Sequence, residues 1–173
     1  MRPTYRIIPA REQDLHFLPV IELAAAQLLV GHAPESVLHE TTNVRHFRQA
    51  LAGGRLWVAV TGHIPVGFAH VELLPSGAPH LEEIDVHPSH GRQGLGRRLV
   101  GATCDWVTRQ GHPAITLTTF RDVPFNMRFY ASCGFHEVSA ADLGSELRAI
   151  VKNEAERGLA PERRVVMRWR SQP

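Results

Sequence analysis

The residues best suited to chemistry begin with a glycine-rich stretch, Gly-Arg-Gln-Gly-Leu-Gly-Arg at residues 91–97. Because glycine has no side chain, such a loop lets the backbone approach a ligand closely and point successive N–H groups toward it. An amphipathic helix pattern follows at once, and the dipole of that helix adds partial positive charge at the same place. The stretch therefore predicts a site that holds phosphate groups.

Composition indicates an ordinary soluble globular protein. The chain has 173 residues, 43% of them hydrophobic and 21% charged, with a net charge of +2 when histidine is neutral. These values suit one domain over residues 1–173 with a sizeable core, and they predict no nucleic-acid partner. The apolar stretch at residues 17–30 is too short and too polar to span a membrane and lacks a signal-peptide layout. We therefore expect no membrane association and a cytoplasmic location.

Cysteine and histidine usage excludes two other classes of protein. The two cysteines, Cys104 and Cys133, are too few for a disulfide framework, so we expect reduced and partly buried thiols. The eleven histidines are scattered without the spacing of a metal site, which predicts no bound metal.

Hydrophobic spacing predicts the elements that position the glycine-rich stretch. Strands are expected at residues 5–8, 56–60, 64–74, 80–86, 114–119 and 165–169, and helices at 17–28, 37–52, 94–110, 126–132 and 143–158. Short turns join the middle strands, whereas one long helix separates residues 86 and 114. We therefore expect an α/β (α+β) fold with a mixed, mostly antiparallel central sheet flanked by helices, and one parallel connection through the helix at 94–110.

Five segments in order resemble the GNAT superfamily of N-acetyltransferases. They are residues 6–10 with Asp14, residues 56–60, residues 65–69, residues 84–88 leading into 91–96, and Phe129-Tyr130 with Gly134-Phe135. Together they span residues 5–138. A single glycine loop is a weak signal, whereas five segments in the right order and spacing are a strong one.

The resemblance implies acetyl-CoA as co-substrate, with its pyrophosphate on the N–H groups of the loop. In the family the pantetheine arm pairs as an added strand with the strand that ends at Val86, where an N–H polarises the thioester carbonyl. The guanidinium groups of Arg92, Arg97 and Arg98 either add charge near the phosphates or form solvated helix surface. The cofactor contacts implied are Ile84, Asp85, Val86, Arg92, Gln93, Gly94, Leu95, Gly96 and Arg97.

The resemblance also implies a base and an acid. A lysine-like amine has a pKa of about 10.4, so a carboxylate beside the thioester must remove its proton. Glu82 and Glu83 are adjacent, and because a strand sends adjacent side chains to opposite faces, only one is expected to face the cleft. The spacing to the glycine loop in the family that the chain resembles favours Glu82, with Glu83 second and His80 third, against the alternative of surface carboxylates. Tyr130 occupies the position of the family's acid, which protonates the leaving thiolate, rather than that of a core aromatic.

The acceptor of the family enters between the first two helices, the hairpins and the last strands. This implicates the break at residues 31–35 and the helical insertion near 139–161, whose helix would line the acceptor pocket, pack on a second copy in a homodimer, or cover one sheet edge. Glu72, with Glu82 and Glu83, would suit a cationic acceptor. Asn126 follows Pro124 closely and is expected to cap a helix rather than contact the cofactor.

Three functions compete for these features. The first is an acetyl-CoA-dependent N-acetyltransferase that acts on a small-molecule amine, an amino acid or a peptide N-terminus by direct attack in a ternary complex. The second is a non-catalytic acyl-CoA-binding sensor or regulatory domain, against which Tyr130 and the two glutamates favour the enzyme. The third, a dinucleotide-binding oxidoreductase, fails because Leu99 stands where the third glycine should be.

Overall fold

Seven strands form one mixed sheet in the computed structural model, which describes residues 3–171. The order across the sheet is β1-β2-β3-β4-β5-β7-β6, and β4 and β5 are the parallel pair among antiparallel neighbours. This confirms the predicted fold class and the single parallel connection. The strands are β1 (Tyr5–Pro9), β2 (Leu56–Thr61), β3 (Ile64–Leu73), β4 (Pro79–Val86), β5 (Ala114–Phe120), β6 (His136–Glu137) and β7 (Arg164–Arg170).

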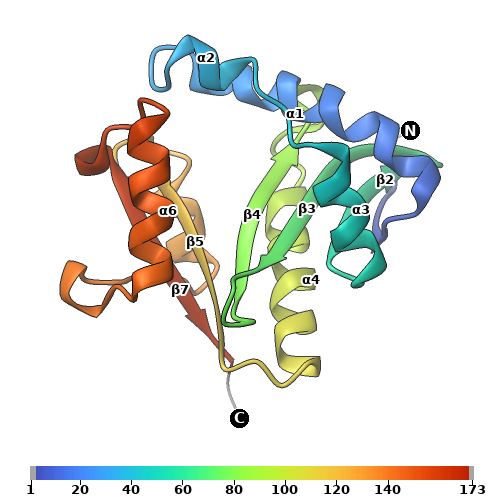
Figure 1. Ribbon diagram of the computed structural model, residues 1–173. Coiled ribbons are helices and arrows are strands. Elements are labelled where there is room, and N and C mark those ends of the chain that lie inside the picture. The colour runs from blue at the N-terminus through green and yellow to red at the C-terminus, as the bar shows by residue number, and fades with distance from the viewer. Residues whose placement is uncertain (1–2, 172–173) are drawn as a thin grey trace.

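Helices cover both faces of this sheet (Figure 1). The α-helices are α1 (Leu18–Ala26), α2 (Glu35–Leu38), α3 (Val44–Ala52), α4 (Leu95–Arg109), α5 (Met127–Ser132) and α6 (Ser145–Glu156). Short 3-10 turns are η1 (Glu12–Phe17), η2 (Gln27–Leu29), η3 (Pro88–His90), η4 (Ala140–Asp142) and η5 (Pro161–Arg163). Helix α4 carries the chain from β4 to β5 on one face, whereas α1 and α3 pack on the other.

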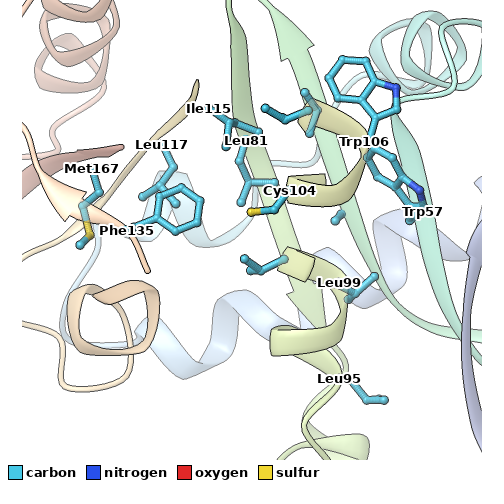
Figure 2. Close-up of a cluster of buried hydrophobic side chains, with 14 of the residues drawn as sticks. Trp57, Leu81, Leu95, Leu99, Cys104, Trp106, Ile115, Leu117, Phe135 and Met167 are labelled. Carbon is cyan, nitrogen blue, oxygen red and sulfur yellow. The ribbon is translucent and has the colours of Figure 1, made fainter. Parts of the chain in front are cut away.

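Two hydrophobic clusters, one on each face of the sheet, explain why the sequences of the middle strands are continuously apolar. Trp57 of β2 packs with Leu95, Leu99 and Trp106 of α4 in the larger cluster (Figure 2). Ala59 of β2 belongs to the same cluster. The alternate residues of β2 point the other way and pack with Ile21 of α1 and Phe47 of α3; they are Leu56, Val58 and Val60. Since both faces of β2 are covered, the alternation of apolar and polar residues typical of a half-exposed strand is absent.

The predicted helix at residues 37–52 is wrong, because the chain forms α2 and α3 with a loop between them. The N–H of Thr42 donates to the carboxylate of Glu22 at 2.9 Å instead of to a helix carbonyl. The side chain of Asn43 then accepts from the N–H of Arg45 at 2.9 Å and caps α3. A long-range carboxylate and a local cap thus end one helix and begin the next.

Candidate active site

The site begins where β4 and β5 separate. Within residues 3–171 these two strands pair only at His80 and Thr116, and Figure 1 shows them diverging from there. The partner strand β3 pairs His70 with Glu83 but Val71 with Leu81, so Glu82 is an extra residue in β4, a β-bulge. A bulge bends its strand and increases the local twist. The backbone edge of β4 beyond the bulge therefore faces open space instead of β5.

A cavity of about 1100 Å³ occupies this separation. It brings together most of the residues that the sequence singled out, from the end of β4, the glycine-rich loop and α5. The predicted residues that line it are His80, Glu82, Glu83, Ile84, Asp85, Val86, Arg92, Gly94, Leu95, Gly96, Arg97, Asn126 and Tyr130. The side chain of Gln93 is absent from this lining, whereas Gly91 is part of it. Both glutamates line the cavity, which corrects the expectation that only one would, because the bulge interrupts the alternation of side chains.

The glycine-rich loop has the backbone of an anion-binding turn. Arg92 has φ of 57° and Gly94 has φ of 73°, both in the left-handed region, and α4 begins at the next residue. Left-handed residues between ordinary ones turn successive N–H groups toward one point, where the dipole of α4 adds its partial charge. Gly96 allows close packing, since a Cβ there would lie 3.2 Å from the ring of Phe129. The loop therefore forms a backbone cradle whose geometry is typical of anion-binding turns.

Two of the three predicted loop cations have partners inside the protein. Arg97 donates to the carbonyl and the hydroxyl of Ser132 at 2.7 and 2.8 Å, which joins α4 to α5. Arg98 donates to the carbonyl of Tyr5 at 3.0 Å. Arg92 also lines the cavity, and within the described part of the chain its guanidinium donates no such hydrogen bond. Arg92 is thus the side chain best placed to add charge to the cradle, and the other two arginines hold its walls together.

Two carboxyl groups share the face of β4 that looks toward α1. Glu83 and Asp85 pair with His70 and Phe68 of β3, whose side chains contact Phe47 of α3. Burial raises the pKa of Glu83 to about 8, helped by the charges of Glu22 and Glu82. Burial also raises the pKa of Asp85 well above its ordinary value, with further contributions from Glu83 and Glu22. This face of the sheet therefore favours the uncharged form of its carboxyl groups.

Glu82 lies in different surroundings from its neighbour. Its side chain is exposed to the cavity, and the charges that act on it come from Glu72, Glu154, Arg157 and His46. Desolvation in the cleft is the largest cause of its raised pKa, followed by Glu72 and Glu154. The bulge thus directs two adjacent carboxyls to two different parts of one cavity.

Tyr130 reaches the cavity from α5, on the opposite side of the β4 edge. Its ring packs against Phe129 at 5.0 Å and Phe135 at 5.9 Å between centroids. Burial raises its pKa above the ordinary value, and the charges of Glu83 and Asp85 raise it further. The hydroxyl therefore keeps its proton and lies within electrostatic reach of both carboxyls. Asn126 occupies the N-cap position of α5 as expected, but its side chain makes no capping hydrogen bond.

His80 is a structural link at the base of the cavity. Its ring is buried, and its Nδ1 lies 2.8 Å from the Thr116 hydroxyl, at the single point where β4 and β5 pair. Burial lowers its pKa to about 4, so the ring is neutral at neutral pH. The two cysteines are free as predicted, and burial raises the pKa of Cys104 to about 12.

The far wall contains charged residues that the sequence reasoning missed. Glu154 of α6 accepts from Arg164 at 2.7 and 2.9 Å and from Thr118 at 2.5 Å, and this buried pair lines the cavity. Arg157, just after α6, pairs with Glu40 of the loop between α2 and α3. These contacts join residues far apart in the chain, so no local motif marks them. The signal available was a glutamate on the apolar side of a helix otherwise buried through Leu147 and Ile150.

The helix of the insertion near 139–161 lines the cavity. Of the three roles expected for it, this agrees with lining a pocket. Ile150, Asn153 and Glu154 of α6, with Arg157 and Leu159 beyond it, contribute to the wall. Among residues 3–171 no helix is long and apolar enough to cross a membrane. The same residues contain no group of three or more His, Cys, Asp or Glu side chains arranged to hold a metal ion.

This sequence and fold are similar to those of known acetyltransferases. The Acetyltransferase (GNAT) family model matches residues 22–135, more than half of the chain. The PaiA N-acetyltransferase from Thermoplasma acidophilum, solved in complex with coenzyme A, superimposes with a TM-score of 0.67 at 12% identity, covering 96% of this chain and 99% of its own. The ribosomal-protein-S18-alanine N-acetyltransferase from Escherichia coli gives 0.66 at 19% identity, covering 98% and 96%.

A third structure is N-acetylglutamate synthase from Neisseria gonorrhoeae, complexed with coenzyme A and N-acetyl-glutamate. It gives a TM-score of 0.71 at 14% identity, covering all of this chain and 36% of its own. Identities this low show the shared fold and leave the acceptor open. The fold and the site define an acyltransferase. The chain belongs to the acetyltransferase (GNAT) family.

Proposed function

We propose that the protein transfers the acetyl group of acetyl-CoA to a primary amine, by direct attack of the amine within a ternary complex. One observation carries the proposal: the anion-binding loop, the unpaired edge of β4, a carboxyl group and Tyr130 all line a single cavity. When bound, acetyl-CoA supplies an activated thioester. The residues of the chain orient it, take a proton from the amine and return one to sulfur.

Orientation comes from the backbone. The N–H groups from Arg92 to Arg97 suit the diphosphate, and the β4 edge at Ile84 to Val86 suits an extended arm added as a further strand. An N–H of this edge is also suited to polarising the thioester carbonyl. Strand β3 packs closely against β4 at this point and holds the edge in place. A Cβ at Gly67 of β3 would lie only 2.8 Å from the Asp85 carbonyl oxygen.

Proton removal is assigned to Glu83. Its pKa of about 8 lies roughly two units below the value of about 10.4 for a lysine-like amine, whereas an ordinary glutamate lies about six units below. Proton transfer is most effective when donor and acceptor are matched in this way. Glu83 thus takes the role that spacing alone favoured for Glu82.

Proton return is assigned to Tyr130. Its raised pKa keeps the hydroxyl protonated. Its ring packs with the cluster on the α4 side of the sheet, whereas Glu83 and Asp85 pair with residues that face α1 and α3. As the carbon–sulfur bond breaks, the hydroxyl donates its proton to the leaving thiolate, and the tyrosinate, a strong base because its pKa is raised, recovers a proton from the protonated Glu83. Base and acid then act on opposite sides of the thioester.

The test has two parts. Calorimetry with coenzyme A and acetyl-CoA should show heat of binding, and loss of thioester absorbance should follow when a panel of amines is added. The panel contains alkyl monoamines, diamines, amino acids and peptides with free N-termini. Absence of binding at millimolar coenzyme A would overturn the co-substrate, whereas binding with no turnover on any amine would favour the non-catalytic sensor.

A further inference from the structure

The two adjacent carboxyls of the bulge divide the acceptor side of the cavity into an inner and an outer part. In the register of β4 against β3, Glu83 pairs with His70, whereas Glu82 is the bulged residue and has no partner there. Glu83 is influenced by Glu22 of α1, by Glu82 and by Arg164 of β7, and it acts on Tyr130. Glu82 is influenced by Glu72, Glu154, Arg157 and His46, toward the side of α3 and α6. The inner carboxyl therefore lies with the acid–base machinery, and the outer carboxyl lies beside it, toward α3 and α6.

The cations that act on Glu82 are already paired with other groups. Arg157 pairs with Glu40, and Glu154, which also acts on Glu82, accepts from Arg164 through both carboxylate oxygens. His46 lies 2.7 Å from Glu72 through its Nδ1. Among residues 3–171 Glu82 itself has no ion pair, although its side chain is exposed to the cavity. The outer part of the acceptor side thus presents an unneutralised negative charge.

Most of the remaining wall of the acceptor side is apolar, with Thr118, Thr119 and Asn153 as polar exceptions. The apolar side chains come from α1, η2, α2, the end of β5, the loop before α5, α6 and the segment that follows α6. These residues are Ala25, Leu28, Leu29, Val37, Phe120, Phe125, Ile150 and Leu159. Leu28 and Phe125 are about half exposed, at 52% and 50%, so this surface is open to a ligand rather than fully packed. A hydrocarbon body with cationic groups matches such a wall better than a sugar or an anion.

We propose that Glu82 is a specificity-determining residue, which holds a second ammonium group of an aliphatic diamine while the reacting amine lies at Glu83. This inference rests on the proposed acetyl transfer to an amine. The methylene chain of the diamine lies along the apolar wall, and the charge at Glu82 is matched by the end of the acceptor that is not acetylated. An acceptor with a carboxylate at that end would instead meet a like charge.

The inference is tested with three acceptors of matched length: 1,4-diaminobutane, n-butylamine and 4-aminobutyrate. We expect kcat/KM for the diamine to exceed that for the monoamine by about tenfold or more, the factor typical of one charge-assisted hydrogen bond. The aminobutyrate should be the poorest of the three. At pH 9, where Glu83 is ionised with or without the charge of Glu82, the substitution Glu82→Gln should remove the preference by raising KM for the diamine about tenfold, while kcat and the monoamine values change little.

The control is Glu156→Gln, since Glu156 lies on α6, outside the cavity lining, within 3.9 Å of Lys152. This control should keep the preference. Equal kcat/KM for diamine and monoamine in the unaltered protein would overturn the inference while leaving acetyl transfer intact. A loss of kcat with every acceptor in Glu82→Gln would overturn it too, because Glu82 would then be the base. No turnover with any of the three amines would count against the proposed function itself.

Discussion

The two halves of the cavity are built by different means. The half suited to the co-substrate uses backbone: left-handed residues at 92 and 94, the start of α4, and the open edge of β4. The half suited to the acceptor uses side-chain charge: Glu22, Glu82, Glu83 and Asp85. Backbone geometry is encoded locally, whereas the charges act together only because the fold collects them. Substitutions in the co-substrate half should therefore weaken acetyl-CoA binding, whereas substitutions in the acceptor half should lower kcat or alter its pH dependence.

The largest expected effect is loss of the base on the acceptor side. Glu83→Gln removes the group that accepts the amine proton while keeping its size. We expect kcat to fall by about 10²- to 10⁴-fold, the range typical of a positioned general base, and the dissociation constant of acetyl-CoA to stay unchanged. Single-turnover kinetics and calorimetry measure the two quantities. A near-normal kcat would remove Glu83 from the chemistry and return the role to Glu82.

Tyr130→Phe tests the acid at the boundary between the halves. Only the hydroxyl is lost, and the ring can keep its packing against Phe129 and Phe135. We expect kcat to drop by roughly 10²-fold with little change in coenzyme A affinity. A thiol with a lower pKa in an acetyl-CoA analogue should narrow the deficit, because such a thiolate leaves without a proton. Unchanged turnover in this variant would exclude the tyrosine.

Gly94→Val tests the backbone half. A β-branched side chain at φ of 73° is strained by about 1–3 kcal/mol, so the loop should lose its shape. We expect acetyl-CoA to bind about tenfold or more weakly, with kcat at saturation largely preserved. The matched control is Gly101→Ala on α4, where a Cβ would meet nothing within 4 Å and helix propensity predicts a small gain in stability. Equal affinity in Gly94→Val and the native chain would contradict a backbone cradle.

The difference between the two halves also explains which parts of the fold and of the site could be predicted from the sequence. The sheet, the crossover helix α4 and the loop follow from periodicity and glycine spacing, which are local. The bulge at Glu82 is set by register against β3, and the pairing of Glu154 with Arg164 joins α6 to β7. Strand alternation therefore gave the wrong expectation at Glu82 and Glu83, and the two-residue strand β6 is too short to show any period. Partners distant in sequence leave no spacing to detect.

The raised carboxyl pKa values also predict how stability changes with pH. Because the folded pKa of Glu83 is about 8, above its unfolded value, the folded state binds this proton more tightly. The associated stability is complete below the unfolded pKa and is lost as pH rises through 8. The apoprotein should therefore lose about 1–2 kcal/mol, or several degrees in Tm, between pH 6.5 and 9.

The buried histidines do not interfere in that range, since their lowered pKa values place their contribution below pH 6.5. Thermal unfolding in Glu83→Gln, compared with the native chain, isolates the carboxyl. The variant should show a flatter dependence of Tm on pH. Parallel curves for the two proteins would mean that Glu83 is ionised throughout, and its assignment as a matched base would fail.

The smallest change in activity should come from substituting Glu22. This residue both holds the loop before α3 and raises the pKa of the carboxyl groups on β4. Its carboxylate accepts from the N–H and hydroxyl of Thr42 at 2.9 and 2.7 Å, and its charge raises the pKa of both Glu83 and Asp85. Glu22→Gln should move the acidic limb of the kcat/KM profile to lower pH by about half a unit, because a neighbouring negative charge is removed. Thr42→Val, which keeps that charge but loses a hydrogen bond, should leave the limb in place.

If the acidic limb instead follows the pKa of whichever amine is supplied, the titrating group is the acceptor and not Glu83. A carboxylate that both orders the loop before α3 and tunes the base would explain why a buried charge stands on α1, a helix whose other buried residues are apolar.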